Sequence, residues 1–384
     1  MFEKALSGGS RYWAWIFFLL AGIGAGFIAY MKQLNEGLGI TGLSRDVSWG
    51  LYIVQFTFLD GIAASAVMLV VPYYLHNYKK FGKIVVLAEF LAVSSVIMCM
   101  LFILADLGQP ARVMNMILHP TPGSVMFWDA VVLSGYLFLN IIIGWTTLAA
   151  EKKQVAAPKW VKPLIYLSIP WAFSVMMVSA FLYAGLPGRH LWLNAILAAR
   201  FIASAFAGGP ALLILLALLI KKLSRFDPGE EAIQSLAKIV TYAMCADVFF
   251  FLLELFTAFY SGIPALALPI KYLFVGLEGH TTYVPWLWSA TVLAIAGIVL
   301  LINPGTRRNE VTLIAALAAI IIASWIGKGM GLIAGVFVPN SFDRVTEYSP
   351  TVLELVITFG IYAVGLLVLT VLYKVAVAVR EETA

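Results

Sequence analysis

The 384 residues of this chain are 62% hydrophobic and only 12% charged, with a mean hydropathy of +0.95. Soluble domains carry about 25% charged residues, so this composition excludes an ordinary soluble enzyme and favours the lipid bilayer as the solvent. The net charge of +5 does not indicate a nucleic-acid partner, because the basic residues are scattered over short loops and form no continuous patch.

Hydrophobic runs long enough to cross a bilayer, roughly 20 residues each, follow one another along the whole chain. They predict an all-α, polytopic integral membrane protein that forms a single membrane domain, because lipid leaves few other backbone structures viable. The ten expected spans are 13–31, 51–75, 84–104, 126–149, 163–184, 193–220, 238–262, 286–303, 311–335 and 353–374. The segments between them are too short for a separate soluble domain, and the longest lie at 32–50, 105–125 and 263–285.

The distribution of Lys and Arg predicts the orientation. If the N-terminus is cytoplasmic, 17 of the 25 Lys and Arg fall in cytoplasmic segments and six in the opposite loops. We therefore expect a cytoplasmic-membrane protein with both termini in the cytoplasm and its longer loops outside. The first span could instead be a signal peptide, although it is long for one and no convincing cleavage site follows it. Removal of the first span as a signal peptide would leave every later loop on the same side of the membrane as predicted here.

Ionisable groups inside the spans are costly unless they face a bundle interior, so they are candidate functional residues. Asp247 and Glu254 lie two helical turns apart on one face and could relay protons. The alternative is structural: Arg200 and Lys328 could pair with Glu254 and Glu354 as interhelical ion pairs. The remaining carboxylates in the spans are Asp60, Glu89 and Asp129.

These three carboxylates differ in their sequence surroundings. Glu89 has no basic residue nearby in its own helix, which favours a protonated carboxyl group or a proton path. Asp60 follows about two and a half turns of helix and precedes a run of small residues, so it is expected to face a bundle. Asp129 follows Ser124 closely, where a helix N-terminus alone would stabilise it.

Cysteines and histidines argue against a metal centre in this chain. Each of the two cysteines lies within a predicted helix, so the chain cannot ligate an iron-sulfur cluster alone. The four histidines lie in loops or at helix ends, which disfavours a haem held between the spans. His119 and His280 fall in outward loops, where an imidazole can hydrogen-bond a ligand or remain a simple interfacial residue. The residues concerned are Cys99, Cys245, His76, His119, His190 and His280.

Three segments carry recognisable motifs: Trp49–Ser65 is rich in small residues, Asp106–Arg112 reads Asp-Leu-Gly-Gln-Pro-Ala-Arg, and Pro120–Trp128 enters the next span. With these motifs the chain resembles the NrfD/polysulfide reductase family of membrane subunits over essentially its whole length. Within the family it is most similar to the quinone-interacting subunits of sulfate-respiring complexes. Two departures from the family pattern are Asp60, where many relatives have Gly or an apolar residue, and Phe127-Trp128-Asp129, where they have Ser-Trp-Gly.

The resemblance implies two four-helix bundles, at about 51–184 and 193–335, with 13–31 and 353–374 as peripheral helices. It also implies a menaquinone site near the outer face of the first bundle. Carried onto this sequence, the site would draw on Tyr52, Gln55, Phe56, Asp60, His119, Trp128 and Asp129. The proton-pathway candidates are Glu89, Asp247, Glu254, Arg200 and Lys328.

The expected activity is electron exchange between menaquinone and partner subunits, linked to dissimilatory sulfur metabolism. The partners implied are a periplasmic-side iron-sulfur subunit, a multihaem cytochrome, and other membrane or cytoplasmic redox subunits. The chain itself would carry no haem, no iron-sulfur cluster and no catalytic residue of its own. The alternative is an ion or small-molecule transporter, or a proton pump, that uses the buried carboxylates.

Overall fold

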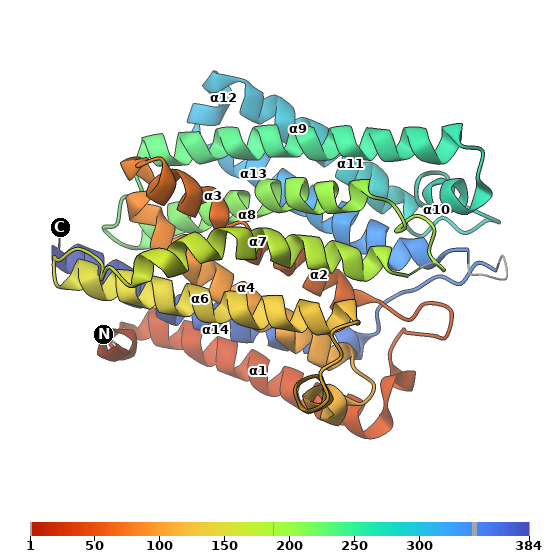
Figure 1. Ribbon diagram of the computed structural model, residues 1–384, viewed down its shortest axis with the longest axis horizontal. Coiled ribbons are helices and arrows are strands. Elements are labelled where there is room, and N and C mark those ends of the chain that lie inside the picture. Colours follow the sequence, from red (N-terminus) through yellow and green to blue (C-terminus); the bar gives the residue numbers. More distant parts are fainter. Residues whose placement is uncertain (1, 187, 340–343, 384) are drawn as a thin grey trace.

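The computed structural model describes residues 2–186, 188–339 and 344–383 as a helical protein (Figure 1). Within these ranges ten helical segments are long and apolar enough to span a membrane, and no strand is formed. The predicted all-α fold with ten spans is therefore confirmed. Most span ends move outward, by up to eight residues, as at the start of Glu230–Tyr260 and the end of Val352–Glu382.

Nine of the spans contain one long α-helix each, and the second is built from shorter pieces. The long helices are α1 (Ser10–Glu36), α4 (Gly82–Asp106), α6 (Val125–Lys152), α7 (Val161–Ala184), α8 (Ile196–Leu223), α9 (Glu230–Tyr260), α11 (Val284–Ile302), α13 (Glu310–Ser324) and α14 (Val352–Thr383). The second span combines α2 (Leu51–Ala64), α3 (Val67–Val70) and a π-helical turn at Val71–Leu75. Another π-helical segment, η6 (Trp325–Ala334), continues α13.

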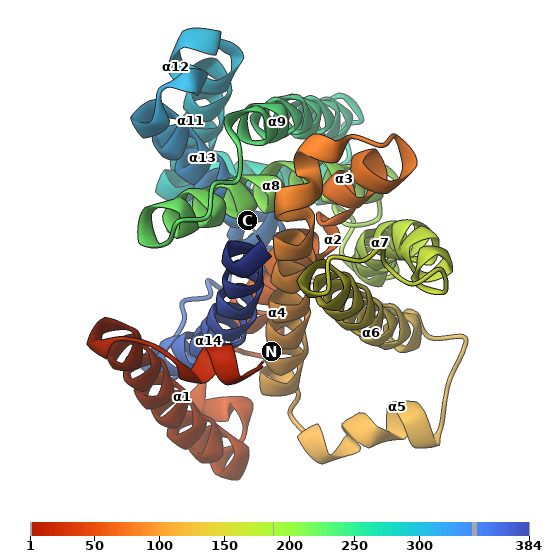
Figure 2. The same cartoon turned by 90° about the vertical axis from the view of Figure 1, so that its left-hand side faces the viewer.

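The spans pack into two groups with a third pair at the side (Figure 2). Helices α2, α4, α6 and α7 contact one another, and α8, α9, α11 and α13 form a second group. Helix α2 also packs on α8 and η6, so it joins the two groups. It is buried on nearly all sides, which explains why its sequence is hydrophobic all round.

Helix α1 packs on α14 beside the first group. The two backbones approach closely at a pair of glycines, where a Cβ atom added to Gly26 would lie 2.6 Å from the Cα of Gly360. Small residues permit this approach of two backbones, a common device in membrane helices.

Both termini lie at one end of the molecule, which we call the terminal end (Figure 1). Lys4 there forms an ion pair with Glu382, and the guanidinium of Arg380 donates 3.1 Å hydrogen bonds to Glu151. The opposite end, called the loop end, carries the segments 37–50, 107–124 and 275–283.

Two of the long segments between spans contain short helices. The segment 105–125 forms a 3₁₀ turn at Pro110–Met114 and a helical turn, α5, at Asn115–Leu118. The segment 263–285 contains α10 (Pro264–Phe274), which is apolar but, at 11 residues, too short to span a membrane.

Candidate functional site

A cavity of about 860 Å³ opens at the loop end of the first helix group. Side chains from α2, α4, α6 and α7 form its walls, and the 107–124 segment covers it with Val113, Met116, Ile117 and Pro120. Its lining is mainly apolar, and its size lies within the usual range for ligand pockets, about 300–1,000 Å³.

Asp129 supplies one carboxylate to this cavity. It lies more than one turn inside α6, and its side chain is 3% exposed. The hydroxyl of Ser179 on α7 donates a 2.9 Å hydrogen bond to Asp129 Oδ1. The carboxylate is therefore fixed by a neighbouring helix, and its position is not that of an N-cap.

Asp106 supplies a second carboxylate, from the last residue of α4. Its Oδ1 atom is buried and has no hydrogen-bond partner. A helix C-terminus is a poor location for a negative charge, because the helix dipole places partial negative charge there. A ligand hydroxyl or a proton at this oxygen would satisfy it.

Three aromatic side chains line the same cavity as the two carboxylates and form what we call the aromatic wall. Trp49, Phe56 and Tyr183 all line the cavity. The ring of Trp49 meets that of Tyr183 edge-on at 5.6 Å, and the Tyr183 hydroxyl lies 2.5 Å from Thr57 Oγ1. Each of these rings offers an apolar face or edge against which a planar ligand can pack.

Of the seven residues that the sequence suggested for this site, Phe56 and Asp129 line the cavity. Tyr52 instead donates a 2.7 Å hydrogen bond to Gln33 Oε1. Gln55 Oε1 accepts hydrogen bonds from Trp325 Nε1 and Tyr362 Oη. Both side chains thus tie α2 to other helices and do not border the cavity.

The other three suggested residues also lie outside the cavity lining. His119 is exposed on the 107–124 segment, and Trp128 is 47% exposed and donates a hydrogen bond to Pro122 O. Asp60 is completely buried inside the protein.

Sequence reasoning did not assign Trp49, Asp106 and Tyr183 to the site. The first two lie within the motif segments and could have been included, whereas no sequence signal marked Tyr183.

Asp60 faces a buried cation between the two helix groups. Neither of its carboxylate oxygens has a hydrogen-bond partner. Lys328 on η6 interacts electrostatically with both Asp60 and Asp247, and its Nζ atom lies 4.1 Å from the ring centre of Phe201. Nζ has no hydrogen-bond partner either. Lys328 thus lies between a carboxylate of each group.

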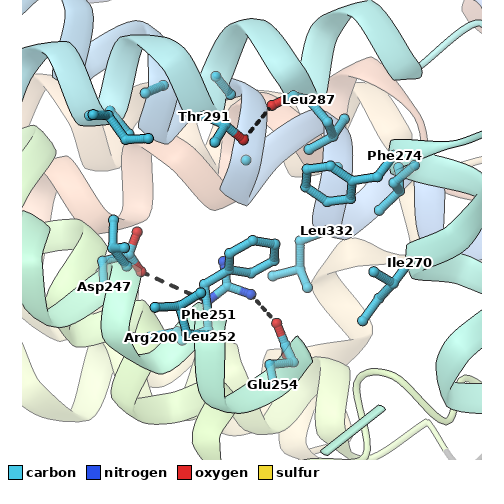
Figure 3. Close-up of a pocket in the computed structure, with 18 of the residues that line it drawn as sticks. Arg200, Asp247, Phe251, Leu252, Glu254, Ile270, Phe274, Leu287, Thr291 and Leu332 are labelled. Atoms are coloured by element: carbon cyan, nitrogen blue, oxygen red, sulfur yellow. Dashed lines mark hydrogen bonds and ion pairs between the residues drawn. The ribbon is translucent and has the colours of Figure 1, made fainter. Parts of the chain in front are cut away.

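The second helix group contains a buried ion-pair cluster (Figure 3). Arg200 on α8 donates a hydrogen bond from Nη1 to Glu254 Oε2, and its Nε atom lies 3.8 Å from Asp247 Oδ1. The guanidinium of Arg200 therefore faces Asp247 and Glu254, two carboxylates of α9. Lys328 does not pair with Glu354, which accepts hydrogen bonds from Gly42 N, Tyr348 Oη and Thr351.

Glu89 on α4 lies nearer the terminal end and is also buried, at 1% exposure. Both of its carboxylate oxygens lack hydrogen-bond partners, and so do Tyr74 Oη and Thr147 Oγ1. Glu89 interacts electrostatically with Glu151 and Arg380 at that end of the molecule. Gly144 permits the close packing of this carboxyl group, because a Cβ atom added there would lie 3.2 Å from Glu89 Oε2.

In the parts of the chain that the structure describes, no three His, Cys, Asp or Glu side chains gather where they could hold a metal ion. Cys99 is buried against Phe56 O, and Cys245 is exposed on α9.

The structure thus defines a polytopic helical membrane protein with a covered apolar cavity at one end. The sequence profile described as polysulphide reductase, NrfD, matches residues 39–326, and the chain belongs to this family.

Three similar proteins cover nearly the whole chain. A putative membrane subunit of dimethyl sulfoxide reductase from Halobacterium salinarum is 26% identical, over 93% of this chain and 89% of that protein. The Hdr-like menaquinol oxidoreductase integral membrane subunit of Archaeoglobus fulgidus is 24% identical, over 99% and 97%. The menaquinone reductase integral membrane subunit of Nitratidesulfovibrio vulgaris is 24% identical, over 95% and 91%. These relatives are membrane subunits of multi-subunit oxidoreductases.

Proposed function

We propose that this chain is the menaquinone-binding membrane subunit of a redox complex, and that the 860 Å³ cavity holds the quinone ring. The observation that carries the proposal is a single apolar cavity that combines an aromatic wall with two carboxylates, Asp106 and Asp129. A quinone needs an apolar slot for its ring and tail, together with a few polar groups near its oxygens.

The residues present fit such a ligand. Trp49, Phe56 and Tyr183 offer apolar ring surfaces, and the unpartnered Oδ1 of Asp106 can accept a hydrogen bond from a hydroxyl group. When bound, menaquinone supplies the two-electron, two-proton redox chemistry.

The protein side chains would bind the ring and handle its protons. A charged Asp129 accepts a hydrogen bond from a ligand hydroxyl, and a protonated Asp129 donates one to a carbonyl oxygen. Ser179 holds this carboxylate in place. The 107–124 segment covers the cavity and limits the entry of water, which strengthens these polar contacts.

Electron exchange would require partner subunits, because the described chain offers no cluster of metal ligands. The names of the Archaeoglobus and Nitratidesulfovibrio relatives, which specify menaquinol or menaquinone, support the choice of quinone. Within the family we propose a role like that of DsrP, the membrane subunit of the DsrMKJOP complex of sulfate respiration. Its partners would be a periplasmic-side iron-sulfur subunit, a multihaem cytochrome, and other membrane or cytoplasmic redox subunits.

The proposed orientation follows from the charge bias, with both termini in the cytoplasm. The loop end and its cavity would then face the periplasm, next to the iron-sulfur partner.

We also propose that Glu89 lies on a proton path between the terminal end and the cavity. Its two unpartnered oxygens, with Tyr74 Oη and Thr147 Oγ1, form a buried polar group between Glu151 and the interior. Arg200, Asp247, Glu254 and Lys328 form a second charged group that could carry protons.

These buried charges also suit the alternative, an ion transporter or proton pump without redox partners. The two functions differ in what the purified protein contains. The native protein should be isolated in mild detergent, and co-purifying redox subunits and quinone should be identified by absorbance and mass spectrometry. Redox partners together with bound quinone support the proposal, whereas an isolated chain that drives ion flux without them supports the transporter.

A further inference from the structure

A second, separate cavity of about 340 Å³ lies in the other helix group (Figure 3). It is bounded by α8, α9, α10, α11, α13 and η6, and it shares no lining residue with the first cavity. Arg200, Asp247 and Glu254 form one charged side of it in the close-up. The other walls are mainly apolar, and the hydroxyl of Thr291 there donates a hydrogen bond to Leu287 O.

The cavity opens sideways, toward the bilayer. Two of its lining residues, Leu252 on α9 and Ile295 on α11, are each more than half exposed. Leu252 lies eight residues before the end of α9 and Ile295 eleven residues after the start of α11, which is about 12–16 Å along each helix. A molecule that enters here must therefore come from the hydrocarbon layer.

Charge restricts what can enter. Arg200, the cation in the cavity lining, is already paired with Glu254 and lies near Asp247, so it offers little attraction to an anionic phosphate headgroup. An inorganic cation would have to cross hydrocarbon to reach the opening, which is costly. The occupant that fits best is a neutral, lipid-soluble molecule.

Hydrogen bonding and ring contacts narrow the choice further. Glu254 is 3% exposed, and its Oε1 has no hydrogen-bond partner. Asp247 Oδ1 and Arg200 Nε also lack one and face each other at 3.8 Å. These atoms can accept from a hydroxyl group and donate to a carbonyl group. The rings of Phe251 and Phe274, with centroids 5.8 Å apart, border the same space.

We propose that this cavity is a second binding site for a quinone-class ring, entered laterally between α9 and α11. Its polar anchor is the Arg200–Asp247–Glu254 cluster, and its ring contacts are Phe251 and Phe274. Lys328 interacts electrostatically with Asp247 of this cluster and with Asp60 of the first helix group.

The test is photolabelling of the native complex with an azido-naphthoquinone, followed by peptide mapping. Labels are expected on α9 or α11 in addition to α4 or α6. Ala294→Phe fills the second cavity and should reduce the α9/α11 label by about tenfold or more while sparing the α4/α6 label. Val292→Phe is the matched control, because Val292 lies on α11, is exposed and lines neither cavity.

Each outcome separates this site from the first one. A label on α4 or α6 alone, or an α9/α11 label that survives Ala294→Phe, overturns the second site and leaves the proposed function standing. A label on α9 or α11 alone supports the second site and contradicts the first. Ala290→Leu is a smaller filling change for use if Ala294→Phe fails to fold. If mass spectrometry of the labelled α9 and α11 region finds only bound phospholipid and no quinone label, the quinone assignment of the second cavity is overturned.

Discussion

The hydroxyl of Ser179 on α7 donates a 2.9 Å hydrogen bond to Oδ1 of Asp129 on α6. This bond joins two helices at the wall of the loop-end cavity and fixes the direction of the carboxylate. The sequence offers a simpler explanation for Asp129, a position near a helix N-terminus after Ser124. In the structure it is a buried carboxylate held at a cavity by a neighbouring helix.

The first prediction is that Asp129→Leu weakens quinone binding by about tenfold to a hundredfold. The loss of one buried hydrogen bond to a ligand oxygen costs about 1–3 kcal/mol. Ser179→Ala should produce a smaller loss, because the carboxylate remains but is less well held. The measurement is titration of the purified complex with a quinone analogue.

Trp128→Phe and His119→Leu are the controls for this experiment. Both side chains are exposed and lie outside the cavity lining, so neither change should alter quinone affinity. Unchanged affinity in Asp129→Leu, or a strong loss in either control, would contradict the assigned position of the ring.

The second prediction concerns Glu89→Gln, which should slow turnover and leave quinone affinity unchanged. Glu89 is buried on α4, does not line the cavity, and has two unpartnered oxygens that can carry a proton. A Gln side chain keeps the size but cannot release a proton. Steady-state rates and ligand titration on the same preparation separate the two effects, and equal rates in variant and parent would exclude a proton role.

The sequence predicted the ten spans well because each hydrophobic run is long enough to cross a bilayer. The site was less predictable, since helix register and interhelical contacts decide which face of a helix borders a cavity. Gln55 and Phe56 are neighbours in α2, yet Phe56 lines the cavity and Gln55 bonds to Trp325 and Tyr362. Tyr183 is held at the site by a contact with Thr57, which is far away in the sequence, so no local sequence pattern predicts its position.

The third prediction is that the terminal end faces the cytoplasm. Single cysteines placed in the segments 76–83, 150–162 and 221–237 should resist an impermeant maleimide applied to intact cells, because these segments hold ten of the 25 Lys and Arg. A cysteine at Gly123 in the loop-end segment 107–124, which is exposed and has room for a side chain, should react. The background should carry Cys99→Ala and Cys245→Ala. Efficient labelling of the terminal-end loops would reverse the orientation and move both cavities to the other side.

The fourth prediction is that acid destabilises the loop-end segment 276–283, which contacts Glu347. Glu347 accepts hydrogen bonds from Tyr272 Oη, Thr282 N and Thr282 Oγ1, and its Oε2 lies 3.3 Å from His280 Nδ1. Partial burial would raise the pKa of Glu347, but these contacts more than offset it and hold the pKa below its usual value.

A carboxylate whose pKa is lowered in the folded state stabilises the fold above its unfolded pKa, and this stabilisation is lost as the pH falls through the folded pKa. The protection factors of the amides in 276–283, which correct for the pH dependence of intrinsic exchange, should therefore fall below about pH 4.3, the ordinary Glu value. Glu347→Gln should exchange faster already at neutral pH. Equal exchange in parent and variant at neutral pH would show that these contacts do not hold the loop.

The last prediction tests the electrostatic contact between the two helix groups. Lys328 is 6% exposed, and its charge faces Asp60 on α2 and Asp247 on α9. Removal of one partner leaves an uncompensated buried charge, which typically costs about 3–5 kcal/mol. Lys328→Met and Asp60→Asn should therefore each lower the thermal stability of the purified protein. The double variant should lose less stability than the sum of the two single losses, with a coupling free energy of about 0.5–3 kcal/mol.

The matched control is Lys328→Met with Glu89→Gln, because Glu89 does not interact with Lys328. The losses of stability in this pair should be additive. Additive effects for Lys328→Met with Asp60→Asn would show that these two residues do not hold the helix groups together.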